Sequence, residues 1–389
     1  MAAIRALYCH IPFCRTICPF CAFAVHGNRE RLHADYLRRL EREIGLAAAG
    51  NGGPSQPIES LYFGGGTPST LTLEELEPLM AALRRNFPLS PDAEIAFECN
   101  PEDVRGPYLS GLRRLGIDRL SLGIQSFDEK TLAALGRNHN GRRSREALRE
   151  VQRHGPANYN VDLMFGAPGI DPRAFAGDVA AVIDAEPPHV SLYGLDLEPG
   201  TLFARDPAVR EWDGRHKQAQ AEAYLDAAER LTRAGYRHYE VSNFCRPGYD
   251  GRQNRIVWDG GNYLGFGTGA HSHVDGVRRH NHRHLRAYSR SLDAGEAPEA
   301  FREALSAVQR ANETLMLSLR RDTGLDTAQW ERCHGIPWGE ARNKTAAALA
   351  AAGKAQWAAG RLVLTARGFL VADAVTEQLM AGADEQVAV

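Results

Sequence analysis

Strand-like runs alternate with longer helical stretches through the first half of the chain, and this order restricts the possible folds. Six short runs are typical of β-strands, at residues 6–11, 60–63, 94–99, 119–124, 158–164 and 189–193. Between them Leu and Ala recur at helical spacing, at residues 29–49, 72–86, 103–115, 144–154 and 173–185. Parallel strands joined by helical crossovers produce this order, so the sequence predicts an α/β fold, either an open sheet or a full or partial barrel.

The alternation stops after residue 193. One long helix is expected at residues 215–234, and a Gly-rich segment at residues 260–272 lies in the region that follows. From residue 301 onward the pattern predicts helices at residues 301–319, 327–334, 340–352 and from 366, with a strand pair around Gly360. Helices with a small hairpin are typical of a winged-helix-type module. Only Arg342 and Lys344 are basic in the helix at 340–352, so we expect a structural or docking role there instead of DNA binding.

Charge and hydropathy exclude two classes of partner. The chain has 46 Lys and Arg against 48 Asp and Glu, so no global field attracts nucleic acid or an anionic membrane. No window of about 18 uncharged apolar residues could form a transmembrane segment, and the first residues run into strand-like sequence without an apolar signal region. We therefore expect a soluble, cytoplasmic protein.

Three of the seven cysteines crowd into eight residues directly after the first predicted strand. Cys14, Cys18 and Cys21 follow the spacing CxxxCxxC, so three thiolates can meet on one small object. Zinc would need a fourth ligand nearby, whereas three sulfurs suit three irons of a [4Fe-4S] cluster and leave the fourth iron open to a small chelator. The spacing favours the cluster, with zinc or a redox thiol loop as alternatives.

Glycine or polar residues end the other predicted strands. The second strand runs into Gly64-Gly65-Gly66-Thr67-Pro68, where missing Cβ atoms let the backbone approach a ligand and exposed N–H groups can hold a carboxylate. The next four strands end at or near Glu98, Gln125, Asp162 and Tyr193. Active sites of barrels assemble at the C-terminal ends of the strands, so we expect these residues and the cysteines to form one site.

The stretch from Tyr8 to Phe23, YCHIPFCRTICPFCAF, resembles the opening of the radical SAM enzymes. It is most similar to the branch that contains oxygen-independent coproporphyrinogen III oxidase and the HemW-type haem chaperones. GGGTP and three later stretches, LYGLDLEPGT, YEVSNF and YLGFGTGAHS, also look like this branch, so the resemblance covers nearly the whole chain.

The resemblance implies a partial (βα)6 barrel and a C-terminal, mainly helical, winged-helix-like domain. The implied divisions are a radical SAM barrel at residues 1–215, a connecting region that completes the side of the barrel at 216–300, and a HemN-type helical domain at 301–389.

The resemblance also implies cofactors. In the family, three cysteines, here Cys14, Cys18 and Cys21, hold the cluster. The open iron is chelated by S-adenosylmethionine, and one electron from the cluster cleaves its sulfonium bond to give a 5′-deoxyadenosyl radical. A flavodoxin- or ferredoxin-type electron donor is therefore implied as a partner.

Two sets of residues carry over to S-adenosylmethionine by resemblance. The contacts expected for the cluster-bound molecule are Tyr8, Glu98, Gly65, Gly66 and Thr67. The positions that hold a second S-adenosylmethionine in the oxidase are matched by Phe20, Gln125, Arg137 and Asp162. The second set could equally line a substrate pocket.

Two positions bear on which member of the branch this chain resembles. Phe23 stands where the oxidase usually has a further cysteine, and this favours the haem chaperones. Their haem-associated motif HNxxYW, however, reads QNRIVW here, with Gln253 and Val257 in place of His and Tyr. A Gln amide is a poor axial ligand for haem iron compared with a neutral imidazole. The remaining candidates for haem binding in this motif are Asn254 and Trp258. Nearby histidines could substitute for the missing imidazole, first among them His271, together with His273, His280, His282 and His284.

Two functional classes follow from these observations. As a carrier, the protein would bind haem and hand it to apo-haemoproteins. As a catalyst, it would act on a tetrapyrrole, by oxidative decarboxylation like the coproporphyrinogen III oxidase or as a related radical methyltransferase. The whole-chain resemblance favours the carrier. The sequence leaves open whether the protein acts as a monomer or as a homodimer.

Overall fold

A computed structural model describes residues 3–50 and 56–382 of the chain. Its centre is a curved wall of six parallel strands in the order β1, β4, β5, β6, β7, β8. The bounds are β1 Ile4–Ile11, β4 Ile58–Gly65, β5 Leu89–Cys99, β6 Arg119–Gln125, β7 Asn158–Phe165 and β8 His189–Gly194. All six strands expected from the sequence are present. Strands β1 and β8 do not pair, so the wall is a partial barrel.

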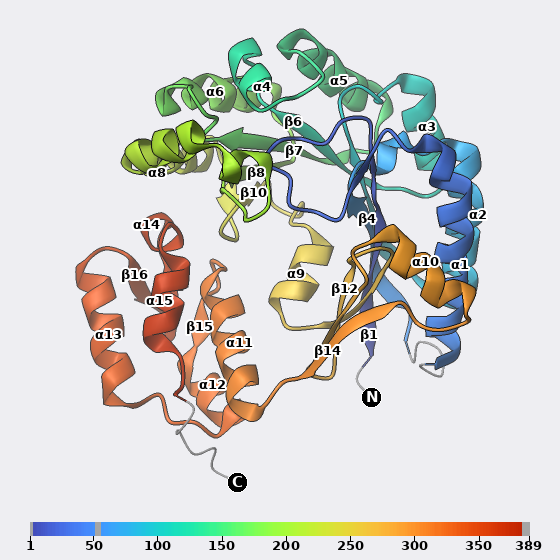
Figure 1. Cartoon of the computed structure of the whole chain (residues 1–389). Coiled ribbons are helices and arrows are strands. Elements are labelled where there is room, and N and C mark those ends of the chain that lie inside the picture. Colours follow the sequence, from blue (N-terminus) through green and yellow to red (C-terminus); the bar gives the residue numbers. More distant parts are fainter. Residues whose placement is uncertain (1–2, 51–55, 383–389) are drawn as a thin grey trace.

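Helices cover the outer side of the wall (Figure 1). Their bounds are α1 His33–Gly50, α2 Leu73–Asn86, α3 Gly106–Arg114, α4 Glu129–Ala134, α5 Gly141–His154, α6 Phe175–Ala185 and α8 Pro207–Arg233. Helix α2 begins with a capping box, in which the Thr72 hydroxyl accepts from the Glu75 amide and the Glu75 carboxylate accepts from the Thr72 amide. The short helix α4 was not expected from the sequence.

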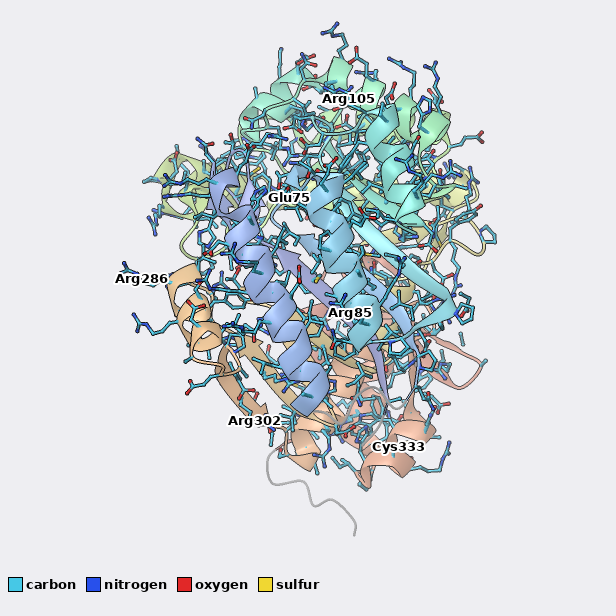
Figure 2. The ribbon with its side chains drawn as sticks, turned by 90° about the vertical axis from the view of Figure 1, so that its right-hand side faces the viewer. Glu75, Arg85, Arg105, Arg286, Arg302 and Cys333 are labelled. Carbon is cyan, nitrogen blue, oxygen red and sulfur yellow. The ribbon has the colours of Figure 1, made fainter. Side chains whose placement is uncertain are left out.

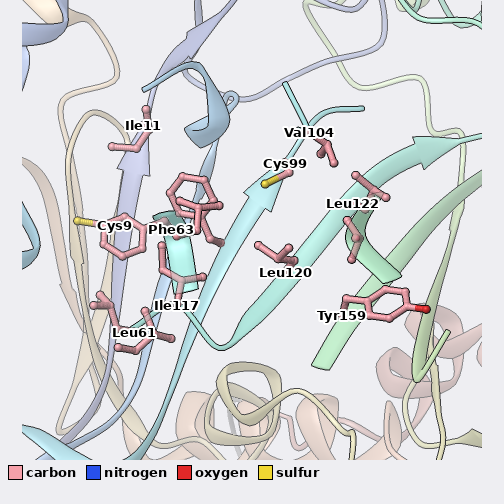
Figure 3. Close-up of a cluster of buried hydrophobic side chains, with 14 of the residues drawn as sticks. Cys9, Ile11, Leu61, Phe63, Cys99, Val104, Ile117, Leu120, Leu122 and Tyr159 are labelled. Carbon is pink, nitrogen blue, oxygen red and sulfur yellow. The ribbon is translucent and has the colours of Figure 1, made fainter. Parts of the chain in front are cut away.

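The core lies between this wall and the helices. Figure 3 shows apolar side chains of β1, β4, β5 and β6 packed against Val104 and Ile117, which lie in the connections around α3. Cys9 and Cys99 are part of this cluster and are fully buried, as expected for small hydrophobic side chains. Figure 2 shows Arg85 and Arg105 on the outside of the same layer, where their charges stay in water.

Among the helices of the described residues, none combines the length and the apolar composition that a membrane span needs.

The sheet continues past β1 with strands that the sequence reading did not assign. β11 Asn262–Phe266 pairs parallel to β1, and β12 His271–Val274, β13 Val277–Asn281 and β14 Glu299–Ala304 follow as antiparallel neighbours. Helices α9 Arg252–Trp258 and α10 Leu285–Asp293 lie in the same region, and β9 Arg237–His238 and β10 Asn243–Cys245 extend the other edge beyond β8.

A buried carboxyl group ties this extension to the barrel. Glu43 of α1 accepts hydrogen bonds from the Gly267 amide at 2.8 Å, from Asn281 at 2.6 Å and from the Tyr288 hydroxyl at 2.6 Å. Burial nevertheless raises the pKa of Glu43 to about 7. These bonds fix the Gly-rich loop after β11, which explains how a segment rich in glycine holds one conformation.

The helix expected at residues 301–319 was partly wrong. Residues up to Ala304 pair with β13 as β14, and α11 Ala307–Leu319 begins only after a capping box of Ser306 and Gln309. Cross-strand pairing therefore overrides the helical pattern of the first residues. The expected divisions at residues 215 and 301 fall inside α8 and inside β14.

The C-terminal domain has its own core of aliphatic and aromatic side chains around Trp330. It comprises α11, α12 Thr327–His334, α13 Gly339–Ala351, α14 Ala366–Phe369 and α15 Ala372–Leu379, with a small sheet of β15 Leu325–Asp326, β17 Arg361–Leu364 and β16 Ala355–Ala358. The strand pair expected around Gly360 is β16 and β17. Figure 1 shows these helices as a group beside the open edge of the barrel.

Candidate functional site

The three clustered cysteines line one cavity of about 520 Å³ at the C-terminal ends of the barrel strands. Cys14 ends the two-residue strand β2 Phe13–Cys14, which pairs with β3 His26–Gly27, and the other two cysteines follow on the loop between these strands. All three thiols are free and partly exposed. The loop thus presents its sulfurs to the space in which the ends of β4 to β8 also meet.

The three sulfurs suit an iron–sulfur cluster, because a [4Fe-4S] cluster takes one thiolate on each of three irons. Two neighbours suit such a cluster, because Arg137 Nη1 lies 3.3 Å from Cys18 Sγ and the Thr67 hydroxyl lies 3.6 Å from Cys14 Sγ. Donors to the sulfurs stabilise their negative charge.

The glycine run at the end of β4 brings the chain against the cysteine loop. Gly65 has a φ of +114°, and a Cβ atom there would lie 2.3 Å from Nδ1 of His10. A Cβ atom on Gly66 would lie 2.8 Å from the carbonyl oxygen of Phe13. Only glycine permits this approach.

The expectation that amides of this run are free to hold a carboxylate was wrong. The Gly65 amide donates to Glu98 Oε2 at 3.1 Å, the Gly66 amide to the carbonyl of Ile11 at 2.9 Å and the Thr67 amide to that of Phe13 at 2.8 Å. The three residues still line the cavity. They can contact a ligand through their surface and through the Thr67 hydroxyl, instead of through free N–H groups.

Glu98 lies deep in the cavity wall. Its Oε1 accepts a hydrogen bond from the Tyr62 hydroxyl at 2.8 Å. Burial raises the pKa of Glu98 to about 7, and the two hydrogen bonds only partly oppose this. A buried carboxyl of this kind is suited to bind a cationic ammonium group, because the positive charge would lower the pKa of the carboxyl toward its usual range.

The structure does not place Tyr8 in the wall of the cavity. Its ring stacks on Tyr62 at 6.1 Å, and its hydroxyl bonds with His10 Nδ1 at 3.0 Å. The tyrosine that lines the cavity is Tyr62, directly paired with Tyr8 across β1 and β4. The sequence reading missed Tyr62, whose only signal is a polar tip two residues before the glycine run.

Four further residues expected from the sequence line the same cavity: Phe20, Gln125, Arg137 and Asp162. Asp162 accepts from the Ser121 hydroxyl at 2.9 Å and from Asn160 at 2.6 Å, and burial raises its pKa. Gln125 has a left-handed φ of +63°.

Two polar atoms of these residues have no hydrogen-bond partner. Gln125 Oε1 and Arg137 Nε are both buried without one within the described residues. Buried polar atoms are rarely left unpaired, so these two fit a site completed by a polar ligand. Asn100 was missed by the sequence reading, although it directly follows the strand end at Glu98, and it accepts from Arg137 Nη2 at 2.8 Å.

The residues expected to bind haem do not all line one cavity. Asn254, Trp258 and the replaced position Gln253 all lie on α9, and Gln253 is buried with its Oε1 unpaired within the described residues. Trp258 lines one cavity of about 450 Å³, whereas His271 lines another of about 410 Å³ together with Val257. Asn254 lines neither.

Comparison with known proteins agrees with this arrangement. Residues 8–180 match the model of the Radical SAM superfamily, and residues 305–371 match the HemN C-terminal domain. The chain is 37% identical to "Heme chaperone HemW" of Mycobacterium tuberculosis, over 96% of this chain and 94% of that protein. It is 34% identical to the protein of the same name from Escherichia coli, over 76% of this chain and 80% of that protein.

A solved structure extends the likeness to the fold. Coproporphyrinogen III oxidase (HemN) from Escherichia coli, a radical SAM enzyme, superposes with a TM-score of 0.83 and 25% identity. The match covers 97% of this chain and 90% of that one, including the barrel and the C-terminal domain. The chain belongs to the HemW family of radical SAM proteins.

Proposed function

We propose that this protein is a haem chaperone of the cytoplasm, which binds haem and hands it to apo-haemoproteins. The observation that carries the proposal is the extent of the likeness to the HemW proteins, which runs through the barrel, strands β11 to β14 and the C-terminal domain. A shared barrel alone would support only shared cofactors, because one fold serves many reactions. A likeness over nearly the entire chain supports a shared task.

The cavity supports binding of the two family cofactors by this chain's own residues. Cys14, Cys18 and Cys21 offer thiolates to a [4Fe-4S] cluster, with Arg137 and Thr67 beside two of the sulfurs. When bound, the cluster supplies single electrons to S-adenosylmethionine.

Other residues of the cavity serve the remaining groups of S-adenosylmethionine. Glu98 can accept from an ammonium group, and Gly65 and Gly66 line the same cavity. Gln125 and Asp162, farther along the wall, match positions of a second S-adenosylmethionine or of a substrate, and can accept from hydroxyl or amino groups of such a second ligand.

The rim of the cavity supports access by an electron donor. Phe23 is 70% exposed and Ile17 is 44% exposed, and both lie at the cysteine loop. Apolar side chains that stay in water around a redox centre suit a docking protein. We therefore include a flavodoxin- or ferredoxin-type donor in the proposal.

A radical reaction on a tetrapyrrole is the second candidate. The unpaired Gln125 Oε1 and Arg137 Nε favour it, because they leave polar groups of the cavity for a second ligand. Phe23, in place of the further cysteine of the oxidase, disfavours the oxidase version. The two candidates differ in whether the tetrapyrrole leaves the protein chemically changed.

The test is a titration of the anaerobically reconstituted full chain with hemin, followed at the Soret band, and then mixing with apomyoglobin as acceptor. The proposal predicts saturable binding near one haem per chain and transfer to apomyoglobin. Absence of specific binding, together with 5′-deoxyadenosine formed in step with loss of coproporphyrinogen III, would establish the enzyme instead.

A further inference from the structure

Strands β12, β13 and β14 place three aromatic rings on one face of the extended sheet. His271 pairs directly with His280, and His280 pairs directly with Phe301. Directly paired residues project to the same side of a sheet. The ring centroids of the two histidines are 5.1 Å apart, and the His280 ring stacks on Phe301 at 5.3 Å with an interplanar angle of 14°.

This face is one wall of the cavity of about 410 Å³ that contains His271. Met316 and Leu317 of α11 and Val257 of α9 also line it. The volume lies in the usual range of small-molecule sites, and the lining joins these apolar side chains and Phe301 to histidines and to charged groups that could orient a ligand. The cavity is separate from the cysteine site, with which it shares no lining residue.

The hydrogen bond of His280 determines which ring nitrogen can bind a metal. Its Nδ1 lies 3.1 Å from the carbonyl oxygen of Asn281. A carbonyl only accepts, so Nδ1 carries the proton and Nε2 keeps its lone pair. A backbone carbonyl on one nitrogen is the usual way in which proteins fix the tautomer and orientation of a metal-binding histidine. The Phe301 stack restricts the same ring.

The other histidine of the pair has no such bond. Within the described residues the His271 side chain forms no hydrogen bond, and it is exposed. The partial burial of its ring and the neighbouring His280 lower its pKa, which favours a neutral ring beside the cavity. Two rings in contact on one face cannot bind one iron from opposite sides, so a single axial ligand comes from this pair.

The same face of the sheet carries a cation that can pair with an acidic side group of a ligand. Arg278 is half-exposed, and its Nε and Nη2 both donate to Glu313. Its Nη1 makes no hydrogen bond within residues 3–50 and 56–382, so it can donate to a further carboxylate. A propionate group is such a carboxylate.

We infer that haem binds between the β12–β14 face and α11, with Nε2 of His280 as its axial ligand. This inference rests on the proposed function and names its cargo site. The site supplies the imidazole that is absent at Gln253 on α9, and Val257 of the same helix lines it. An open cavity of this size also lets the haem leave, which a carrier requires.

The test uses the full chain with its cluster reconstituted, and hemin and metal-free protoporphyrin IX as probes. His280→Ala should weaken hemin binding at least tenfold and remove the histidine signature of the ferric haem in electron paramagnetic resonance spectra. Added imidazole should restore that signature. Metal-free protoporphyrin IX should bind the wild type and His280→Ala equally, because only iron uses the ligand.

Two further variants make the test specific. His284→Ala removes an exposed histidine of the same segment that does not line the cavity, and it should bind hemin as the wild type does. Leu317→Trp fills the cavity and leaves every histidine of the chain in place. It should weaken the binding of both hemin and metal-free protoporphyrin IX. Circular dichroism and iron content verify that each variant folds.

The possible outcomes distinguish a failure of the inferred haem site from a failure of the proposed function. If the wild type binds hemin and His280→Ala binds it equally with the same spectrum, the assignment of His280 is overturned. If Leu317→Trp also leaves binding unchanged, the cavity is overturned, although haem binding stands. If the wild type itself fails to bind hemin, the proposed function fails.

Discussion

Arg137 Nη1 lies 3.3 Å from the sulfur of Cys18, although the two residues are 119 positions apart in the chain. Arg137 follows α4, and its Nη2 is held by Asn100 after β5 at 2.8 Å. The contact therefore depends on two barrel strands and on the cysteine loop at once, and it places a fixed positive charge beside the cluster ligands.

Replacing Arg137 by Leu should lower the reduction potential of the reconstituted cluster. The guanidinium stabilises the more negative, reduced form, so its loss makes reduction harder, by about 60 mV, or tenfold in a one-electron equilibrium. Potentiometric titration followed by electron paramagnetic resonance measures the shift. Arg142→Leu, at an exposed arginine of α5, is the matched control and should leave the potential unchanged.

Glu98→Gln should weaken binding of S-adenosylmethionine about tenfold or more, because a hydrogen bond to a charged group contributes about 1.5–3 kcal/mol. The amide keeps the shape of the side chain and loses its charge. Isothermal titration of the cluster-loaded protein measures the affinity. Glu74→Gln, on the exposed first turn of α2, should bind as the wild type does. Equal affinity of Glu98→Gln and wild type would remove Glu98 from the site.

Gly66→Ala should impair the cysteine loop. The added methyl group meets the backbone of residues 11–13 at 2.8 to 2.9 Å, and backbone cannot move aside as a flexible side chain can. We expect a loss of about 1–3 kcal/mol in stability and less iron incorporated on reconstitution. Gly45→Ala is the matched control, since a Cβ on this α1 residue meets nothing within 4 Å. That variant should gain about 0.5–1 kcal/mol from helix propensity.

His238 should make the stability of the protein depend on pH. Its ring stacks on Phe244 at 4.0 Å and lies against Phe369 of α14 at 5.0 Å, and burial lowers its pKa from 6.5 to about 4. Because the pKa of His238 is lower in the folded than in the unfolded state, the unfolded state binds a proton first as the pH falls. The contribution of the neutral ring to the free energy of unfolding is therefore complete above pH 6.5 and is lost as the pH falls toward 4. The loss amounts to about 3 kcal/mol.

The matched variant is His238→Phe, which keeps an aromatic ring and cannot be protonated. Urea unfolding at pH 7, 5.5 and 4.5 should show a steeper decline for the wild type than for this variant. Parallel declines would mean that His238 does not titrate in this range.

Local patterns were sufficient for much of the fold. The six barrel strands, the capping box at Thr72 and the cysteine spacing depend on neighbouring residues, and the structure contains all of them. Strand β11 was not assigned, and the first residues of the expected helix at 301–319, up to Ala304, were read incorrectly. Both are strands only because β1 and β13 offer them partners, and a sequence read in short windows does not contain those partners.

The residues of the candidate site likewise fall into those that local sequence patterns predicted and those whose place depends on the fold. Residue type and position at strand ends predicted Glu98, Gln125 and Asp162, because the ends of parallel strands meet at one edge. Tyr8 and Tyr62 are directly paired on neighbouring strands, and no local pattern indicates which ring lines the cavity. The crowding of His10 against Gly65 and the position of Glu98 decide it in favour of Tyr62.

The sequence by itself determined the thiolate ligand set of the cluster, since three cysteines within eight residues need no distant partner. Only the tertiary structure assembles the cavity in which we infer that haem binds. The register of β12, β13 and β14 and the packing of α11 bring His271, His280, Phe301 and Met316 to one cavity. Such long-range contacts depend on strand pairing and helix packing, which the spacing of residues along the chain does not encode.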